Sequence, residues 1–327
     1  MKQVIGIGNA LVDALYRVEN DAVLAALHLP KGAMTLIDAE SFRNISRRME
    51  GVEVERATGG SACNTVLSLA ALGAHPAVIG RLGRDGNGEF FADYFRQKGA
   101  RTFVVASSAE EPTGVASTFI TPDGQRTFGT FLGAAAGLRA LDIRPEWFEG
   151  FGYLYIEGYL VQNHELIDTA VDMARERGLE VCLDMASYNI VAADREFFAH
   201  LLRKTDIVFA NEDEARAFTG KEPRQALDDL ANVCRTAVVK VGAKGEMARR
   251  GEEFAEMPAE KVANVLDTTA AGDFFAAGFL YALASGSRLE ACLKAGGMLA
   301  AEVIQVAGTK ISDDTWQSIR QKMAELV

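Results

Sequence analysis

Strand-like and helix-like segments alternate along the second half of the chain. Short apolar runs lie at residues 153–156, 180–183, 207–209 and 237–241, and segments with helical spacing lie at 163–177, 195–202, 212–218 and 223–233. This alternation is typical of βαβ units, in which helices connect parallel strands and cover the faces of the sheet. The sequence therefore predicts an α/β fold built on a mostly parallel sheet.

Polar residues and a glycine directly follow several of the predicted strands. They are Asn9, Asp13, Asp184, Asn211 and Gly242. Ligands of open parallel sheets bind beyond the carboxyl ends of the strands. We therefore expect these five residues on one rim of the sheet, where a binding site would form.

Two segments interrupt the alternation, and we interpret them as a lid. The turn Thr121-Pro122-Asp123-Gly124 lies between two β-like runs, which indicates a β-hairpin. A small sheet over the rim would exclude water from a reacting group. The predicted division is a core of residues 1–13, 55–101 and 133–327 and a β-rich lid of residues 14–54 and 102–132.

The composition and charge disfavour several classes of protein. The chain has 327 residues, of which 49% are hydrophobic and 24% charged, as expected for a soluble globular enzyme. Its net charge of -11 and pI near 5.0 argue against nucleic acid or an anionic membrane as the main partner. The sequence shows no signal-peptide pattern and no apolar run long enough to span a bilayer. Its four cysteines are far apart and form no CxxC pair, so we expect a reduced, cytoplasmic protein.

The segment Asp267-Thr268-Thr269-Ala270-Ala271-Gly272-Asp273 carries the clearest chemical signal. Small residues precede an acidic residue, and an apolar helical stretch follows at 274–283. A Gly/Ala-rich turn at the start of a helix forms a nest of N–H donors at the positive end of the helix dipole. Such a nest suits a transferring phosphoryl group, and Asp273 could accept the proton of a substrate hydroxyl. The alternative is an ordinary first helical turn with an acid favoured by the dipole.

A second glycine-containing segment, residues 57–64, also precedes a helix. Adjacent Gly59 and Gly60 let a substrate lie against bare backbone, and Asn64 offers one acceptor and two donors to hydroxyl groups. Asp13, just after the first strand, could accept two hydrogen bonds from vicinal hydroxyls. The alternatives are a turn with a helix cap for the first segment and a solvated loop acid for Asp13.

Four motifs, in the order found here, resemble the ribokinase-like (PfkB) family of carbohydrate and nucleoside kinases. They are residues 6–13, residues 57–64 with the run on to Leu72-Gly73, residues 211–214 and residues 267–273. The resemblance extends over essentially the whole chain. It implies a three-layer α/β/α domain with a mostly parallel sheet and a small β-sheet lid. It also implies ATP-dependent phosphorylation of an alcohol group, with Mg²⁺ as cofactor.

The resemblance assigns roles on the acceptor side of the site. Asp273 would be the general base, and the backbone of the preceding nest would be the anion hole. In relatives, the residues that match Asp13 and Asn64 hold sugar hydroxyls. The nest here is Ala270, Ala271 and Gly272, and the further acceptor contacts are Asn9, Gly60 and Ser61.

On the nucleotide side, the family's residues match Asn211 and Glu214. They would organise the phosphates and the water shell of Mg²⁺, an ion that prefers such indirect contacts. Gly242 and Gly245 follow a buried strand, and their backbone, together with Thr268, could approach the nucleotide.

Near this side, one residue departs from the family pattern and a separate group of residues matches a cation site. Lys240 stands where a Thr is often found, so we leave it outside the predicted site. Asp267, Thr269 and the carbonyls near 307–308 match places where relatives hold a monovalent cation, which would be K⁺. Simple turn capping is the alternative for these residues.

Two segments, residues 8–13 and 126–135, resemble the adenosine-kinase-like branch of the family. Apolar residues could surround a flat base, which a bare sugar would not require. The alternative is that they pack the lid against the core. Arg126 on the lid could swing in to stabilise the transferring phosphoryl group, and its alternative is an exposed hairpin charge. The residues of the apolar set are Leu11, Met34, Leu36, Phe128 and Tyr159.

We therefore expect an ATP-dependent kinase that phosphorylates the 5′-hydroxyl of adenosine, as a monomer or homodimer. A sugar kinase for ribose, fructose or a 2-keto-3-deoxy sugar acid is the alternative, and polar or charged lid residues would favour it. A non-catalytic nucleoside-binding protein is disfavoured because Gly272 and Asp273 are both present. A dinucleotide oxidoreductase is disfavoured because no Gly-x-Gly-x-x-Gly motif follows the first strand.

Overall fold

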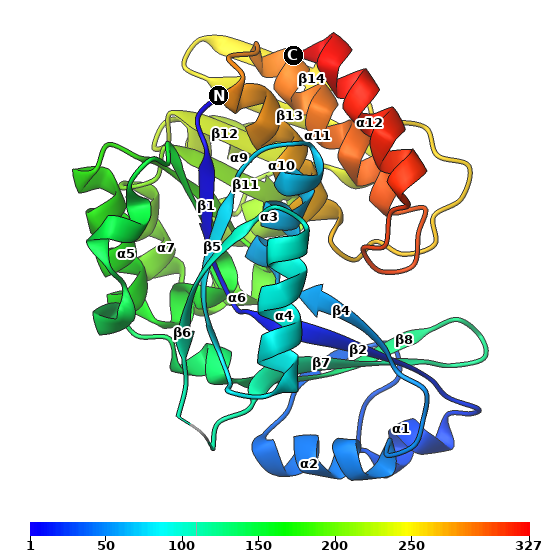
Figure 1. The fold of residues 1–327 in the computed structure, drawn as a ribbon. Coiled ribbons are helices and arrows are strands. Elements are labelled where there is room, and N and C mark those ends of the chain that lie inside the picture. Colours follow the sequence, from blue (N-terminus) through cyan, green and yellow to red (C-terminus); the bar gives the residue numbers. More distant parts are fainter. Residues whose placement is uncertain (109) are drawn as a thin grey trace.

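Two β-sheets of different size form the framework of the computed structural model, which describes residues 1–108 and 110–327 (Figure 1). Residue 109 falls within the predicted lid segment 102–132 and lies outside the described residues. The large sheet has nine strands in the order β14-β13-β12-β11-β10-β9-β1-β5-β6. Their bounds are β1 Val4–Ile7, β5 Ala77–Leu82, β6 Arg101–Ala106, β9 Tyr153–Glu157, β10 Glu180–Asp184, β11 Ile207–Asn211, β12 Thr236–Lys240, β13 Glu246–Arg250 and β14 Glu253–Met257.

The large sheet is parallel except at one edge. Strands β6, β5, β1, β9, β10, β11 and β12 pair in parallel, whereas β13 pairs antiparallel with both β12 and β14. The central parallel strands are buried on both faces, which explains why they read as continuous apolar runs in the sequence. The predicted α/β fold with a mostly parallel sheet is confirmed.

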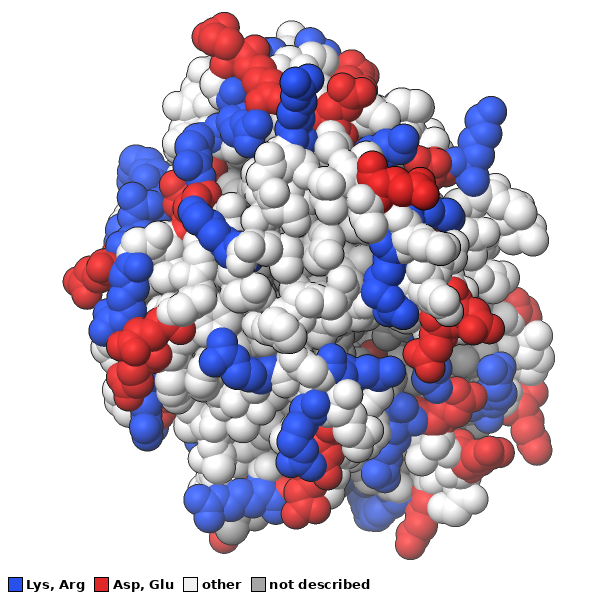
Figure 2. All heavy atoms as spheres, turned by 45° about the horizontal axis from the view of Figure 1, so that its top comes forward, with Lys and Arg blue, Asp and Glu red and all other residues white. Residues whose placement is uncertain are grey.

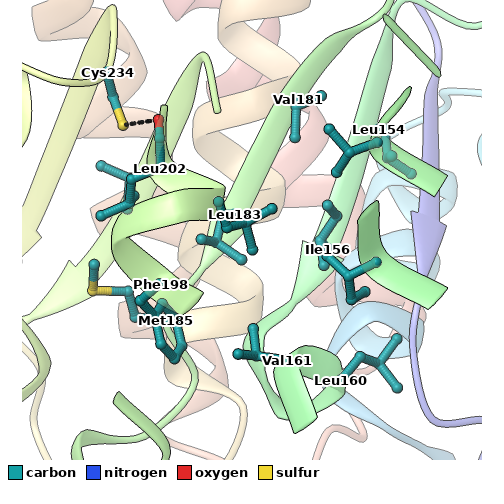
Figure 3. Packing of buried hydrophobic residues seen from close by; sticks show 14 of the residues in the cluster. Leu154, Ile156, Leu160, Val161, Val181, Leu183, Met185, Phe198, Leu202 and Cys234 are labelled. Atoms are coloured by element: carbon teal, nitrogen blue, oxygen red, sulfur yellow. Dashed lines mark hydrogen bonds between the residues drawn. The ribbon is translucent and has the colours of Figure 1, made fainter. Parts of the chain in front are cut away.

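Helices cover both faces of this sheet. Successive side chains of β9 alternate between them, because Leu154 and Ile156 pack into one helical layer and Tyr153 and Tyr155 into the other. Figure 3 shows the first layer, in which the side chains of the central strands lie beside Phe198 and its neighbours. The first layer contains α5 His164–Glu176, α7 Arg195–Leu202, α8 Glu212–Thr219 and α9 Pro223–Ala231; the second contains α3 Ser61–Ala71, α10 Ala271–Ala284, α11 Leu289–Val303 and α12 Asp313–Leu326.

Two other helices complete the layers. Helix α4 (Gly86–Gln97) packs beside α3 and β5 through Phe91 and Phe95. The short helix α6 (Tyr188–Ala193) lies against α8. The result is the three-layer α/β/α arrangement that the family resemblance implies.

The small sheet has five strands in the order β3-β8-β7-β2-β4. The predicted hairpin joins β7 to β8, where the N–H of Gly124 donates to the Thr121 carbonyl at 2.8 Å. One face of the sheet packs on α1 (Ala22–Ala26) and α2 (Ala39–Arg48) through Phe119, Leu24 and Ile45. The bounds are β2 Leu11–Arg17, β3 Met34–Leu36, β4 Glu55–Gly59, β7 Thr113–Ile120 and β8 Arg126–Gly133.

The strands of the two sheets do not follow the expected division at every edge. Residues 11–13 and 55–59 belong to the small sheet, whereas the sequence analysis placed them in the core. Strand β6 belongs to the large sheet, although most of it falls in the expected lid segment 102–132. The reason is that β1 ends at Ile7 and β2 already begins at Leu11, so the chain passes from one sheet to the other within three residues.

The charged side chains are distributed in both signs over the surface that Figure 2 displays. There, Lys and Arg side chains alternate with Asp and Glu side chains around a broad uncharged area. Within the described residues, no helix combines the length and the apolar composition that crossing a bilayer would require.

Helices α10 and α11 pack closely because of a glycine. A Cβ atom at Gly278 would lie 2.3 Å from the carbonyl oxygen of Ala295 in α11. Gly278 is fully inside α10, where an alanine would otherwise be favoured by helix propensity. The close approach of the two helices therefore requires that this position carry no side chain.

Gly278→Ala should destabilise the protein by about 1 to 3 kcal/mol, because the new methyl group would force α10 and α11 apart. The measurement is the free energy of unfolding in urea. Gly86 is a matched control, since it lies in the first turn of α4 with no atom within 4 Å of its Cβ position. Gly86→Ala should be neutral or stabilising by about 0.4 to 1 kcal/mol. Equal stability of Gly278→Ala and the wild-type protein would contradict the packing argument.

Candidate active site

Asp273 lies in the first turn of α10, where α3 meets this helix. The Oγ of Ser61 donates to Asp273 Oδ1 at 2.6 Å, and the Nδ2 of Asn64 donates to Asp273 Oδ2 at 2.9 Å. The hydroxyl of Thr65 donates to the backbone carbonyl of Asp273 at 3.1 Å. Three side chains from the first turns of α3, those of Ser61, Asn64 and Thr65, thus fix both the side chain and the backbone of Asp273.

Burial raises the pKa of Asp273 to about 7, with a further increase from the carboxylates of Asp184 and Glu157. The hydrogen bonds from Ser61 and Asn64 act in the opposite direction because they stabilise the ionised form. A carboxyl group with a pKa near neutrality is suited to accept a proton at the pH where most enzymes operate.

The turn before α10 has the geometry of an N–H nest. Ala270 adopts a left-handed conformation, with φ 61° and ψ 6°, and caps the helix that begins at Ala271. The first N–H groups of an α-helix have no acceptor within the helix, and they lie at the positive end of its dipole. Ala270 is thus the cap of α10, and Ala271, Gly272 and Asp273 form its first turn, while their role as an anion hole and a base stays a prediction.

Asn211 and Glu214 form a capping box at the start of α8. Glu214 accepts from the backbone N–H and the Nδ2 of Asn211, both at 2.7 Å, and Asn211 accepts from the N–H of Glu214 at 2.9 Å. Burial raises the pKa of Glu214 to about 7, and the nearby Asp184 adds to this increase. Asn211 ends β11 and Glu214 follows it, on the same rim as Asp184 at the end of β10.

Lys240, which the sequence analysis left out, lies inside this group of acids. It ends β12 and pairs in register with Asn211 of β11. Its Nζ lies 3.4 Å from Asp184 Oδ2, and a Cβ atom at Gly272 would lie 3.1 Å from the same Nζ. The signal in the sequence was a lysine at the end of an apolar strand, where a charge needs a partner.

Glu157 is a second residue that the sequence analysis missed. It ends β9, is 1% exposed, and accepts hydrogen bonds from the N–H and Nδ2 of Asn9 at 2.8 and 2.6 Å. Its other oxygen accepts from the N–H of Ala62 at 3.0 Å. Burial raises its pKa, and the donors from Ala62 and Asn9 oppose this increase. Glu157 thus ties the β1–β2 connection to the start of α3, and Asn9 is engaged in this contact.

Asp13 lies on the face of the small sheet that is opposite to α2. Burial raises its pKa to about 7, and the guanidinium of Arg126 opposes this increase. Gly59 on β4 pairs in register with Leu11, and a Cβ atom at Gly59 would lie 2.2 Å from Asp13 Oδ1. At Gly60, where φ is 101°, a Cβ atom would lie 2.0 Å from the Asn9 carbonyl oxygen. The two glycines are therefore required by close approach.

The residues of the predicted apolar set differ in how far they are exposed. Strand register places Met34 opposite Phe128, and both share the sheet face that carries Asp13 and Leu11. Met34 and Leu36 are 54% and 58% exposed, so they do not pack the lid against the core. Leu11 is buried and does serve packing, whereas Tyr159 in the short helix η4 (Gly158–Gln162) is 39% exposed.

A cavity of about 890 Å³ lies at the edge of the small sheet rather than over Asp273. Leu36 is the member of the predicted apolar set that lines it, together with Leu132 and the aromatic ring of Phe131. Its wall carries charges of both signs, from Arg43 and Arg84 and from Asp85, Glu110 and Glu111. The exposed side chain of Leu36 therefore borders both the apolar face of the small sheet and this cavity.

Arg126 and Asp267 form an ion pair that joins the small sheet to the loop before α10. Asp267 also accepts from the N–H of Gly308 at 2.8 Å and from the N–H of Thr269 at 3.1 Å. Donors from within the chain therefore occupy both carboxylate oxygens at the place where a monovalent cation was expected.

The turn after β12 has a backbone conformation that favours glycine at two positions. Gly242 and Gly245 have φ values of 56° and 108°, and they flank the short helix η5 (Gly242–Lys244). A Cβ atom at Gly245 would lie 2.0 Å from the Met257 carbonyl oxygen, so this position accepts glycine only. Thr268 lies in the loop before α10, and its carbonyl accepts from the N–H of Ala271 at 3.2 Å.

The fold and this rim define a ribokinase-like α/β protein, with a small sheet next to the carboxyl ends of the parallel strands. Residues 30–316 match the family model described as pfkB family carbohydrate kinase. The chain therefore belongs to the pfkB family of carbohydrate kinases, and it is a kinase.

Solved structures and curated relatives agree with this family. The chain is similar to a probable sugar kinase from Rhizobium etli CFN 42, with 34% identity, a TM-score of 0.88 and coverage of 100% of this chain and 99% of the other. It is similar to the adenosine kinase from Sinorhizobium meliloti, with 34% identity, a TM-score of 0.86 and coverage of 98% and 99%. The ribokinase of Haemophilus influenzae is 26% identical over 86% of this chain and 92% of its own length.

Asp273→Asn should stabilise the folded protein at pH values above 7. Folded Asp273 holds its proton up to a pKa of about 7, whereas the ordinary value is 3.8, so the wild-type protein loses stability as the pH rises between these values. Removing the buried charge should raise the free energy of unfolding by about 1 to 2 kcal/mol at alkaline pH. The difference should disappear as the pH falls toward about 4.

Urea unfolding at about pH 5 and pH 8 tests this prediction. Asp93→Asn is the control, because Asp93 is an exposed acid on α4 with a surface partner, Arg96. It should change the free energy of unfolding by less than about 0.5 kcal/mol at either pH. A less stable Asp273→Asn variant at pH 8 would contradict the argument.

Proposed function

We propose that this kinase transfers the γ-phosphoryl group of ATP to the 5′-hydroxyl of adenosine. The observation that carries the choice of acceptor is the apolar face of the small sheet on the side that carries Asp13, where Met34 and Leu36 are exposed and Phe128 is half-buried. Exposed apolar residues beside a polar clamp suit a ligand with a hydroxylated part and a flat apolar part. Adenosine has both parts, whereas a sugar has only the first.

The chemistry of the transfer follows from the position of Asp273. Its carboxylate accepts the proton of the acceptor hydroxyl while the hydroxyl oxygen attacks the γ-phosphorus. The N–H groups of the turn at Ala270 and Gly272 stabilise the negative charge on the transferring group, and that of Ala271 would join them on leaving the Thr268 carbonyl. Arg126 would add to this stabilisation after leaving Asp267. Asp13, Asn64, Ser61 and the backbone of Gly60 hold the hydroxyls of the acceptor.

The nucleotide would lie along the rim formed by Asn211, Glu214 and the turn from Gly242 to Gly245, with Thr268 beside it. Mg²⁺ in proteins is commonly held by one or two carboxylates together with substrate phosphates and water. Glu214 and Asp184 are the buried carboxylates on this rim, so the residues fit such an ion. When bound, Mg²⁺ would neutralise charge on the phosphates. A monovalent cation such as K⁺ at Asp267 and Thr269 would compete with Arg126 for the Asp267 carboxylate.

A sugar kinase is the second candidate, and one observation favours it. The probable sugar kinase from Rhizobium etli CFN 42 is as similar to this chain as the adenosine kinase from Sinorhizobium meliloti, with 34% identity in both cases. A binding protein without activity is less consistent with the geometry, because Asp273 and the N–H nest are both in place.

The acceptor can be identified by measuring ADP release with a panel of nucleosides and sugars. We expect kcat/KM for adenosine to exceed that for ribose or fructose by about five- to a hundredfold, the equivalent of one good base stack. Phe128→Ser should reduce this preference and leave the rate with sugars nearly unchanged. A kcat/KM for any of the sugars that equals or exceeds that for adenosine would overturn the nucleoside assignment and favour the sugar kinase.

The role of Asp273 can be tested separately with the best acceptor. Asp273→Asn should lower kcat by about 10² to 10⁴ and leave the affinity for ATP nearly unchanged. In the wild-type enzyme, kcat should fall as the pH decreases below about 7, because the base becomes protonated.

Ser61→Ala provides a check on the direction of this pH dependence. The mutation removes a hydrogen bond that stabilises the Asp273 carboxylate, so the pKa rises and the acidic limb moves to higher pH. A limb that moves to lower pH, or full activity of Asp273→Asn, would show that another group is the base.

A further inference from the structure

Lys240 is the basic side chain that lies among the acids of the active site. Its side chain is only 17% exposed, and that of Asp184 is 8% exposed. Burial disfavours the charged ammonium, but the carboxylates of Asp184, Glu214 and Asp273 reverse this effect and raise the pKa of Lys240 above its ordinary value. The ammonium is therefore charged at neutral pH, although it is nearly removed from water.

The hydrogen bonding of Lys240 leaves it with donors to spare. Among the described residues, its Nζ makes one hydrogen bond, to Asp184 Oδ2, and the distance of 3.4 Å is long for a buried ion pair. An ammonium has three N–H donors. The ring of Phe275 lies 5.9 Å from the Nζ and supplies an aromatic surface but no acceptor. Two donors thus remain for a ligand.

The position of Lys240 directs these donors to the start of α10. A Cβ atom at Gly272 would lie 3.1 Å from the Nζ, so the ammonium is adjacent to the backbone of the N–H nest. Strand register brings Lys240 beside Asn211 on the nucleotide side. The ammonium therefore lies where the nucleotide rim meets the first turn that contains Asp273.

We propose that Lys240 is a catalytic residue that donates hydrogen bonds from its ammonium to the oxygens of the transferring phosphoryl group. This role rests on the proposed phosphotransfer. The new bond forms between the acceptor oxygen and the γ-phosphorus, and the bond from the γ-phosphorus to the β–γ bridging oxygen breaks. That electron pair stays on ADP, and the hydroxyl proton moves to Asp273. Lys240 keeps its proton throughout and offsets the charge of Asp184, Glu214 and Asp273, which would otherwise repel the phosphates.

The test compares Lys240→Met, Lys240→Arg and Lys240→Ala with the wild-type enzyme on whichever acceptor the wild type uses best. Lys240→Met should lower kcat by about 100- to 1,000-fold, the loss found when one preorganised donor to a developing anion is removed. The KM for the acceptor should change by less than about threefold. Lys240→Arg should retain more activity than Lys240→Met, and added ethylammonium should partly restore Lys240→Ala.

Lys204→Met is the matched control, because Lys204 also lies between two carboxylates, Asp168 at 3.0 Å and Asp172 at 2.9 Å, but belongs to a surface ion cluster after α7. It should leave kcat unchanged. A kcat of Lys240→Met within about threefold of the wild type would overturn the proposal. Loss of activity in Lys240→Ala without any rescue by ethylammonium would also overturn it, since a purely structural ion pair has that outcome.

A failure of the proposed acceptor is distinguishable from a failure of this proposal. An incorrect acceptor appears in the panel of wild-type rates and does not affect the ratio of Lys240→Met to wild type. If no sugar or nucleoside is a substrate, the same variants are compared by their slow hydrolysis of Mg·ATP, in which water replaces the acceptor. An unchanged hydrolysis rate in Lys240→Met would then overturn the role of Lys240.

Discussion

The contact between α3 and α10 at Asp273 is the interaction on which the site depends. Ser61, Asn64 and Thr65 come from one helix and hold the first turn of the other. Because α10 packs at the same time on α11 through Gly278, the position of the carboxylate is set by the packing of three helices. A carboxylate fixed in this way does not rely on a loop for its orientation.

The unusual electrostatics of the rim follow from how many acids are buried together. Asp273, Glu214 and Glu157 all have pKa values raised by burial, and Asp184 contributes to each increase. One ammonium, that of Lys240, lies among them. Since unpaired buried charge is costly, these acids are stable when they are protonated or when cations lie beside them, and Lys240 is one such cation.

The sequence was sufficient to predict most of the fold, because the alternation of strands and helices is strong and parallel strands have few possible arrangements. Its motifs singled out Asp273, the turn before α10, Asn211 and Glu214 as candidate site residues. It did not predict Lys240 or Glu157, because each ends an apolar strand without a motif around it, and only the pairing of β12 with β11 and of β9 with β1 brings them to the rim. Strand membership at 11–13 and 55–59 also required the three-dimensional pairing of β2 with β4.

The passage from β1 to β2 within three residues has a mechanical consequence. Asp13 belongs to the small sheet, whereas Asn64 and Asp273 belong to helices that pack on the large sheet. A ligand that bonds to both Asp13 and Asn64 bridges the two sheets. Any rotation of the small sheet about the connection at residues 8–10 would lengthen or break the hydrogen bonds to that ligand. Glu157 restrains this connection, because it accepts hydrogen bonds from Asn9 and from Ala62 at the start of α3. Asp13 and the connection at residues 8–10 lie close together in the sequence, so a ligand contact at Asp13 would act directly beside the point of rotation.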